Sequence, residues 1–151
     1  MNPDILLENE LLLLDTIEPS SEQEERILDN VRRLLMYGHR NRNYSNCCGT
    51  YLYVVGQEDS LLGIGPPQFT YWYNIEKAKA PSLGSAVLLF DKAEDEEGSL
   101  NHVTCFLKQE DEEVHVFNQR GSGGSFGIDR VSKLKPGFGT HHDYFNVSLP
   151  D

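Results

Sequence analysis

Two adjacent cysteines open an apolar segment in the stretch NYSNCCGTYLYVVG, residues 43–56, although the chain has only 3 cysteines. A thiolate is a strong nucleophile. The N-terminus of a helix lowers a thiol pKa and offers backbone N–H groups to a developing oxyanion. Asn46 is a good N-cap, which would set Cys47 at the first helical position. The pair therefore predicts a nucleophilic cysteine.

Only one of the two thiols can face a given cleft, because successive helical residues diverge by about 100°. We assign the nucleophile to Cys47 and expect Cys48 to pack inward as a small apolar residue, with Cys48 as the alternative nucleophile. Gly49 would let a substrate or a neighbouring strand approach closely. The aromatic and β-branched residues of TYLYVV favour a strand, so a strand is the competing interpretation of this segment.

A nucleophilic thiol needs a base, and the base needs a group that orients it. His102 begins the apolar segment HVTCFL. If residues 108–112 form the turn of an antiparallel hairpin, Asn118 falls opposite His102, where its amide oxygen can hold the imidazole tautomer. His115 points to the other face in this register. A one-residue shift of the turn would reverse that parity, so His115 is the alternative third member.

A basic cluster stands just before the cysteines, where His39 precedes Arg40, Arg42 and Tyr44. We interpret Arg40, Arg42 and Tyr44 as substrate-binding residues, because a guanidinium can receive a substrate carboxylate. Ordinary surface charge is the alternative.

No metal site or cofactor is expected. The cysteines and histidines lack the Cys-x-x-Cys spacing of structural zinc sites. His102 and Cys105 differ by an odd number on a predicted strand, so they face opposite sides of it. The small-residue tract RGSGGSFG lacks the lysine and spacing of a phosphate-binding loop, which favours a flexible loop.

The elements that must position these residues are a helix followed by strands. Ser21 and Glu24 form a capping box that predicts a helix over 21–37, and glycines and prolines predict a surface loop over 56–68. Strand-like segments follow at 69–75, 85–90, 102–107 and 114–118. A helical first third before a sheet-forming remainder predicts an α+β fold, and 151 residues fit one domain over 1–151.

Charge and composition narrow the partners. The chain has 24 acidic residues against 13 lysines and arginines, which argues against nucleic acid and anionic lipid and leaves a basic protein as a candidate partner. An odd number of cysteines, two of them neighbours, favours a reducing compartment. The apolar N-terminal segment lacks a basic leader and is interrupted by Glu8, Glu10 and Asp15, so neither a signal peptide nor a membrane span is predicted. We expect a cytoplasmic protein, with signal-independent export as the alternative.

Four segments carry a family resemblance over roughly residues 40–125. NCCGTYLYVV resembles the DCSGLV-type nucleophile segment of NlpC-type papain-like cell-wall peptidases, LGSAVLLF resembles their PGDLVFF strand, and NHVTCFL resembles their HVGIYL strand. VFNQRGSGG resembles the segment in which that family and the related CHAP amidases place their third polar residue. The chain departs from the family pattern in having Asn46 for the usual Asp and Cys48 for the usual Ser, and it shows no wall-binding module.

The resemblance implies a papain-like fold, with N-terminal helices packed on an antiparallel β-sheet, and a triad of Cys47, His102 and Asn118. It implies cleavage of amide bonds in short peptides, above all peptidoglycan stem peptides, by thiolate attack and an acyl-enzyme. The same triad would serve acyl transfer or glutamine deamidation on a protein substrate. A catalytically inert binding or effector protein on the same fold is the other functional class.

Overall fold

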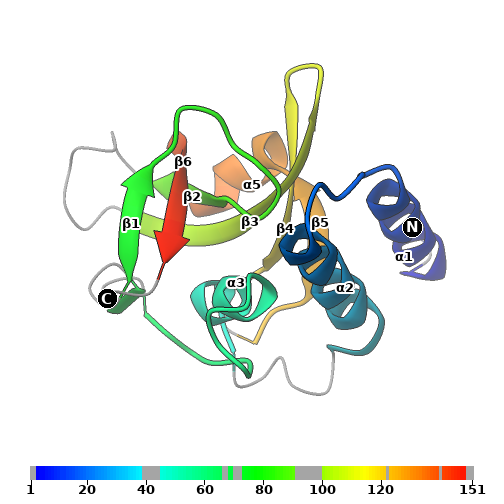
Figure 1. Ribbon diagram of the computed structural model, residues 1–151, viewed down its shortest axis with the longest axis horizontal. Helices are drawn as coiled ribbons and strands as arrows, with labels where there is room; N and C mark the ends of the chain where they lie inside the picture. Colours follow the sequence, from blue (N-terminus) through cyan, green and yellow to red (C-terminus); the bar gives the residue numbers. More distant parts are fainter. Residues whose placement is uncertain are drawn as a thin grey trace.

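A six-stranded antiparallel sheet organises the chain; among the elements that the structure describes in full, three helices precede it in sequence and one helix lies between its last two strands (Figure 1). The computed structural model describes residues 3–38, 45–65, 68–69, 73–90, 100–121, 123–139 and 141–148. The helices in this part are α1 Pro3–Asp15, α2 Glu22–Tyr37, α3 Cys47–Val54 and α5 Val131–Phe138. The strands are β1 Asn74–Lys77, β2 Ala86–Phe90, β3 Leu100–Glu110, β4 Glu113–Gln119, β5 Phe126–Arg130 and β6 His141–Ser148, in the spatial order β1-β6-β2-β3-β4-β5. The predicted α+β class is confirmed.

The predicted helix over 21–37 is present as α2. The side chain of Ser21 accepts a hydrogen bond from the Glu24 N–H at 3.1 Å, and the Gly38 N–H donates to the Leu34 carbonyl at the other end. One stripe of the helix is buried, formed by Ile27, Leu28, Val31 and Leu34. Helical spacing of apolar residues and a local cap were sufficient to predict this element.

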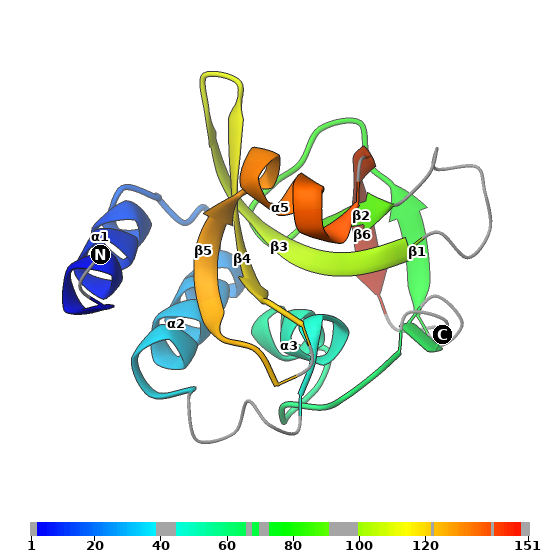
Figure 2. The ribbon, with the colours of Figure 1, turned by 180° about the vertical axis from the view of Figure 1, so that it is seen from behind.

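Two hydrophobic clusters cover the two faces of the sheet. The larger cluster includes the buried residues of α2 and α3 and the strand residues Val103, Cys105 and Phe117. The smaller one lies on the opposite face, under α5 (Figure 2), and consists of Val87, Leu89, Phe106, Val114, Val116, Val131 and Leu134. Alternate residues of β2, β3 and β4 therefore enter different cores, as the pleat requires.

The β3–β4 hairpin is longer than predicted. The predicted turn over 108–112 is wrong, because the strands continue to Glu110 and from Glu113 and the turn is confined to residues 111–112. Asp111 adopts a φ of 54°, the left-handed conformation that Asp tolerates in tight turns. This conformation lets the chain reverse within two residues, so the acidic run extends into both strands.

A β-bulge in β3 restores the parity that the longer hairpin would have lost. Near the turn Lys108 pairs with His115, and this register would place Asn118 opposite Cys105, on the face away from His102. The register shifts between Phe106 and Lys108, so that Cys105 pairs with Phe117. Asn118 is then level with residue 104, two positions from His102 and on the same face of the sheet.

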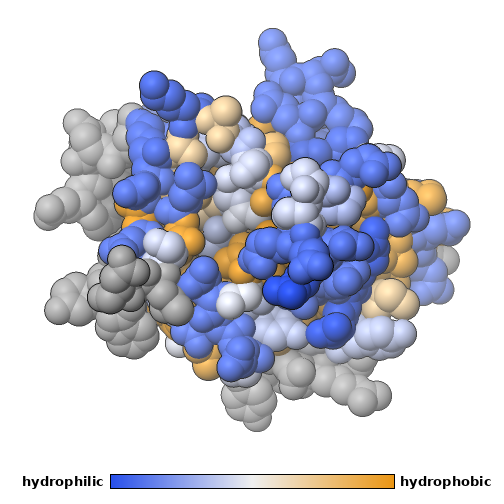
Figure 3. Space-filling view, viewed as in Figure 1, coloured by the Kyte–Doolittle hydropathy of each residue, from blue (hydrophilic) through white to orange (hydrophobic). Residues whose placement is uncertain are grey.

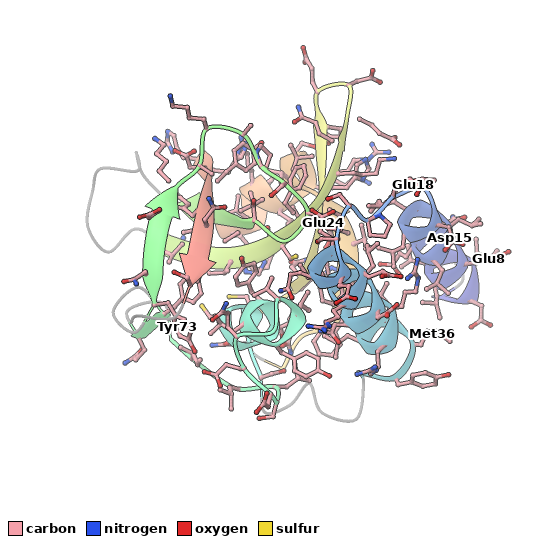
Figure 4. The ribbon with its side chains drawn as sticks, in the orientation of Figure 1. Glu8, Asp15, Glu18, Glu24, Met36 and Tyr73 are labelled. Atoms are coloured by element: carbon pink, nitrogen blue, oxygen red, sulfur yellow. The ribbon has the colours of Figure 1, made fainter. Side chains whose placement is uncertain are left out.

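Several predictions of strands and loops need correction. The strand predicted over 69–75 is observed only from Asn74; the Phe69 N–H instead donates to the Gly65 carbonyl at 2.9 Å, in a helical turn. Phe69 is fully buried between the rings of Tyr51 and Tyr73, at centroid distances of 6.2 and 6.1 Å, and Tyr73 is labelled in Figure 4. Aromatic packing here outweighs the strand preference of the sequence.

Three elements after residue 125 were not predicted. β5 begins inside the small-residue tract, where a loop was expected, and α5 contains Pro136 and Gly137, both of which disfavour helices. β6 is mostly half-buried and rich in polar residues, so it lacks a clear alternation. Tertiary contacts stabilise these three elements: β5 pairs with β4, β6 pairs with β2, and α5 packs on the sheet through Val131 and Leu134.

Helix α1 attaches to the edge of the sheet through one buried carboxylate. Oε2 of Glu10 accepts a hydrogen bond from the Ile128 N–H of β5 at 2.6 Å, and the fully buried Leu14 joins the larger core. Burial raises the pKa of Glu10, against the opposing effects of this hydrogen bond and of Arg120. An edge strand that would otherwise present open backbone groups is thus covered.

The segment predicted as a surface loop over 56–68 is in part an internal support for α3. The Asn46 side chain donates to the Ile64 carbonyl at 2.7 Å and accepts from the Ile64 N–H at 3.2 Å. The Leu62 carbonyl accepts from the Asn46 N–H at 3.3 Å, and a Cβ added to Gly49 would lie 1.7 Å from the Leu62 oxygen. Gly49 therefore permits a close approach, made by this loop.

Gly49→Ala should accordingly destabilise the protein by about 2–3 kcal/mol, because the loop that holds the start of α3 must move away. Gly137→Ala is the matched control, since a Cβ at Gly137 meets nothing within 4 Å; it should be neutral or stabilising by up to about 1 kcal/mol. Urea denaturation followed by circular dichroism measures both. Equal stability of the two variants would show that the loop adapts without cost.

Candidate active site

The cysteine pair lies at the N-terminus of α3, as predicted. Asn46 has extended backbone angles, φ −140° and ψ −175°, and its Oδ1 accepts from the Gly49 N–H at 3.0 Å. Cys47 is therefore the first residue of the helix, and the strand interpretation of this segment is wrong. The buried environment, in which Cys48 and Leu52 are both fully inaccessible, outweighs the β propensity of the segment.

His102 lies in the first part of β3 and is held on two sides. The residue is 1 % exposed, and its ring stacks on Phe138 of α5 with a centroid distance of 4.0 Å and an interplanar angle of 19°. Its Nε2 lies 2.7 Å from Oδ1 of Asn118. The expected proximity of these two residues is observed, although through a bulged register and not through direct opposition.

Asn118 determines which imidazole nitrogen carries the hydrogen. Its Nδ2 donates to the Gly127 carbonyl at 3.2 Å and to Oδ2 of Asp129 at 3.0 Å. Since the amide hydrogens are used there, the Oδ1 atom is left to accept from Nε2–H of His102. Nδ1 of the neutral imidazole is then the basic nitrogen.

Cys47 meets the imidazole at an edge of β3. The Phe106 N–H donates to the Ser85 carbonyl at 2.8 Å, which places this N–H on the β2 side of β3. Because successive backbone N–H groups of a strand point to opposite edges, the Val103 N–H points to the edge of β3 away from β2. Pairing with β4 starts only at Cys105, and α3 packs against β3. In this place the His102 imidazole and the Val103 N–H both lower the pKa of the Cys47 thiol.

The pKa values of the two neighbouring thiols are shifted in opposite directions. Their Sγ atoms lie 3.9 Å apart. The pKa of Cys47 is lowered, first by hydrogen bonding from Cys48 and then by the hydrogen bond and charge of His102 and by the Val103 N–H, against the effect of burial. The pKa of Cys48 is raised, because its S–H donates to Cys47 and because it is fully buried. Cys47 is thus the thiolate and Cys48 its protonated donor.

A second amide, missed by the sequence analysis, ties α3 to the sheet. Gln119 is fully buried, and its Oε1 accepts from the hydroxyls of Ser45 and Thr50, each at 2.7 Å. Its Nε2 donates to the Gly124 carbonyl at 3.0 Å, while the Gly123 N–H donates to the Ser45 carbonyl at 3.1 Å. The signal available in the sequence was a second amide side chain next to Asn118, in the stretch FNQ. Neighbouring residues of a strand point to opposite faces of the sheet, so Gln119 faces away from Asn118.

The remaining candidate residues do not join this group. His115 pairs with Lys108 on the face opposite His102. Cys105 is buried in the larger core, where burial raises its pKa to about 12. All three cysteines are free. Arg40, Arg42 and Tyr44 lie outside the described residues.

Two further findings concern the described part of the chain alone. Within it, no group of three or more His, Cys, Asp or Glu side chains is arranged to hold a metal ion. Nor does any helix there have the length and apolarity needed to cross a membrane.

Comparison with known proteins adds no identification: no family model, curated protein or solved structure matches the chain.

The thiol pair predicts how alkylation depends on pH. Iodoacetamide should modify Cys47 at mildly acidic pH, because its lowered pKa keeps it ionised there. Cys48→Ala should move the midpoint of the alkylation rate upward by about 1 pH unit, since a hydrogen bond to the thiolate is lost. Cys48→Ser keeps a donor and should remain near the wild type.

Mass spectrometry of the modified peptide, over a series of pH values, gives the midpoint for each variant. A wild-type midpoint in Cys48→Ala would mean that Cys48 only fills space. Faster modification of Cys48 than of Cys47 would reverse the assignment of the nucleophile.

Proposed function

We propose that this protein is a cysteine hydrolase that cleaves amide bonds in short peptides through an acyl-enzyme. The observation that carries the proposal is the thiol of Cys47 at a helix N-terminus, beside an imidazole whose other nitrogen is 2.7 Å from the Asn118 amide oxygen. A low thiol pKa, a base and an orienting group are the three requirements of nucleophilic thiol catalysis.

In the proposed reaction the Cys47 thiolate attacks the carbonyl carbon of the amide, and the carbonyl π electrons move to oxygen. First-turn N–H groups of α3 and the positive end of its dipole stabilise that oxyanion. His102, protonated, then gives its Nδ1 proton to the leaving nitrogen as the C–N bond breaks, which yields an amine and a thioester. Water attacks the thioester with His102 as base, and the carboxylic acid and the thiolate separate.

The architecture supports a papain-like, NlpC-type assignment as part of this proposal. A nucleophile on a helix is followed in sequence by a histidine on one antiparallel strand and an asparagine on the next. The two departures from the family pattern have a physical explanation. Asn46 caps the helix without a negative charge that would oppose the thiolate. Cys48 supplies an S–H donor to the Cys47 sulfur. Peptidoglycan stem peptides are the proposed substrates.

A second candidate is glutamine deamidation or acyl transfer on a protein substrate. Cys47 and His102 are only 8 % and 1 % exposed, which favours a narrow approach to the thiol. A single carboxamide side chain enters such a site more easily than a peptide that crosses it. The covalent steps to the thioester are the same, with ammonia as the first product.

A catalytically inert binding or effector protein is the third candidate function. Its motivation is the net charge of −11 and the carboxylates along α1, its connection to α2 and the start of α2, where Glu8, Asp15, Glu18 and Glu24 are labelled in Figure 4. Figure 3 shows hydrophilic residues over much of this face. A basic protein would be its partner.

Incubation with purified peptidoglycan fragments, followed by mass spectrometry, tests the substrate. Loss of intact stem peptide with a gain of one water supports the hydrolase. A glutamine-containing protein that gains about 1 Da, with fragments unchanged, supports deamidation instead. No turnover of either, together with no alkylation of Cys47 at mildly acidic pH, would leave the inert protein.

Substitutions rank the residues. Cys47→Ala should lower kcat by about 10³-fold or more and His102→Ala by about 10²-fold to 10⁴-fold, since these remove the nucleophile and the base. Asn118→Ala should cost about 10-fold to 1,000-fold, because the base loses its tautomer and aim. His115→Ala is the control and should keep wild-type kinetics; the reverse ranking of Asn118 and His115 would contradict the assignment.

A further inference from the structure

A carboxylate on β5 continues the chain of hydrogen bonds beyond Asn118. Oδ2 of Asp129 accepts from Nδ2 of Asn118 at 3.0 Å and from Nε of Arg120 at 2.8 Å, and Oδ1 accepts from Nη2 of Arg120 at 3.2 Å. Asn118 pairs across the strands with Gly127, so Asp129, two residues further along, points to the same face. The carboxylate and its guanidinium thus meet the amide that meets His102.

We propose that Asp129, held by Arg120, is a positioning residue for His102, and that it acts by fixing the orientation of the Asn118 amide. The proposal rests on the catalytic role proposed above for His102. With Asp129 in place, Nδ2 has a charged acceptor and Oδ1 is directed to Nε2–H of the imidazole. Without it, the amide can rotate by 180° and present Nδ2 to His102, which stabilises the tautomer with its hydrogen on Nδ1, toward Cys47.

The Arg120–Asp129 pair is itself constrained. The guanidinium also donates from Nη1 to the Ser125 hydroxyl at 2.7 Å. A Cβ added to Gly127 would lie 2.0 Å from Nη2 of Arg120, so a glycine is needed where the guanidinium lies over β5. The side chains of Arg120 and Asp129 are 31 % and 20 % exposed, and two parallel hydrogen bonds give the pair a defined geometry that a surface ion pair lacks.

The direct test measures the tautomer of His102. The Cys47→Ala background removes the thiolate, and long-range ¹H–¹⁵N correlation spectra of the neutral imidazole distinguish Nε2–H from Nδ1–H. The parent should show Nε2–H alone. Asp129→Asn should show a mixture of both tautomers, and Arg120→Ala should shift the signals in the same direction by a smaller amount.

Kinetics in the chain with Cys47 intact provide the second readout. Asp129→Asn should lower kcat by about 10-fold to 100-fold with KM within about 2-fold, since aim and not substrate binding is lost. Asp143→Asn is the matched control: Asp143, on β6, also has a side chain that is 20 % exposed, and it forms an ion pair with Lys77 of β1 at 2.8 Å. Its substitution should change neither the tautomer nor kcat.

The outcomes are separable. If the fold is kept and Asp129→Asn and Arg120→Ala both retain Nε2–H alone, the positioning role is overturned, whatever the chain hydrolyses. If the tautomer changes but the wild-type chain turns over no amide, the positioning role stands and the hydrolase proposal fails. Should Asp129→Asn unfold, the Arg120→Ala spectrum decides alone.

Discussion

Strand β4 holds both halves of the candidate site, because two neighbouring residues on it point to opposite faces of the sheet. Asn118 bonds to His102 on the α5 face, and Gln119 bonds to Ser45 and Thr50 around the start of α3 on the other. The position of the thiol relative to the imidazole is therefore set by the pleat of one strand. A slip of one residue in this strand would exchange the two amides and separate the pair.

Buried polar groups of this kind stabilise a single arrangement only when each has its partners. The Gln119 amide has two hydroxyl donors and a carbonyl acceptor, and the Asn118 amide has a carbonyl, a carboxylate and an imidazole. Removing one partner would leave a desolvated group, at a cost of about 1–3 kcal/mol. The network thus selects one geometry more than it adds net stability, which is what a site of defined distances requires.

The adjacent cysteines illustrate how one environment separates two identical groups. Both lie in the first turn of α3, yet one thiol meets the imidazole and the Val103 N–H while the other is fully inaccessible. A negative charge is stabilised on the first sulfur and opposed on the second, so their pKa values diverge. The burial of Cys48 keeps its proton available for donation to Cys47.

The sequence by itself determined the features that depend on neighbours within one helical turn. The Ser21 cap of α2 and the Asn46 cap that makes Cys47 the first residue of α3 are bonds across three residues, and the α+β order follows from the spacing of apolar residues. Proximity of Asn118 to His102 was also predicted, but from a turn of the wrong length. Only the tertiary structure decided the bulge between Phe106 and Lys108 that restores their common face, because a bulge reflects the fit of two strands to their cores and not the preference of either. The same holds for Gln119 and Asp129, whose acceptors and donors come from segments that only folding brings together.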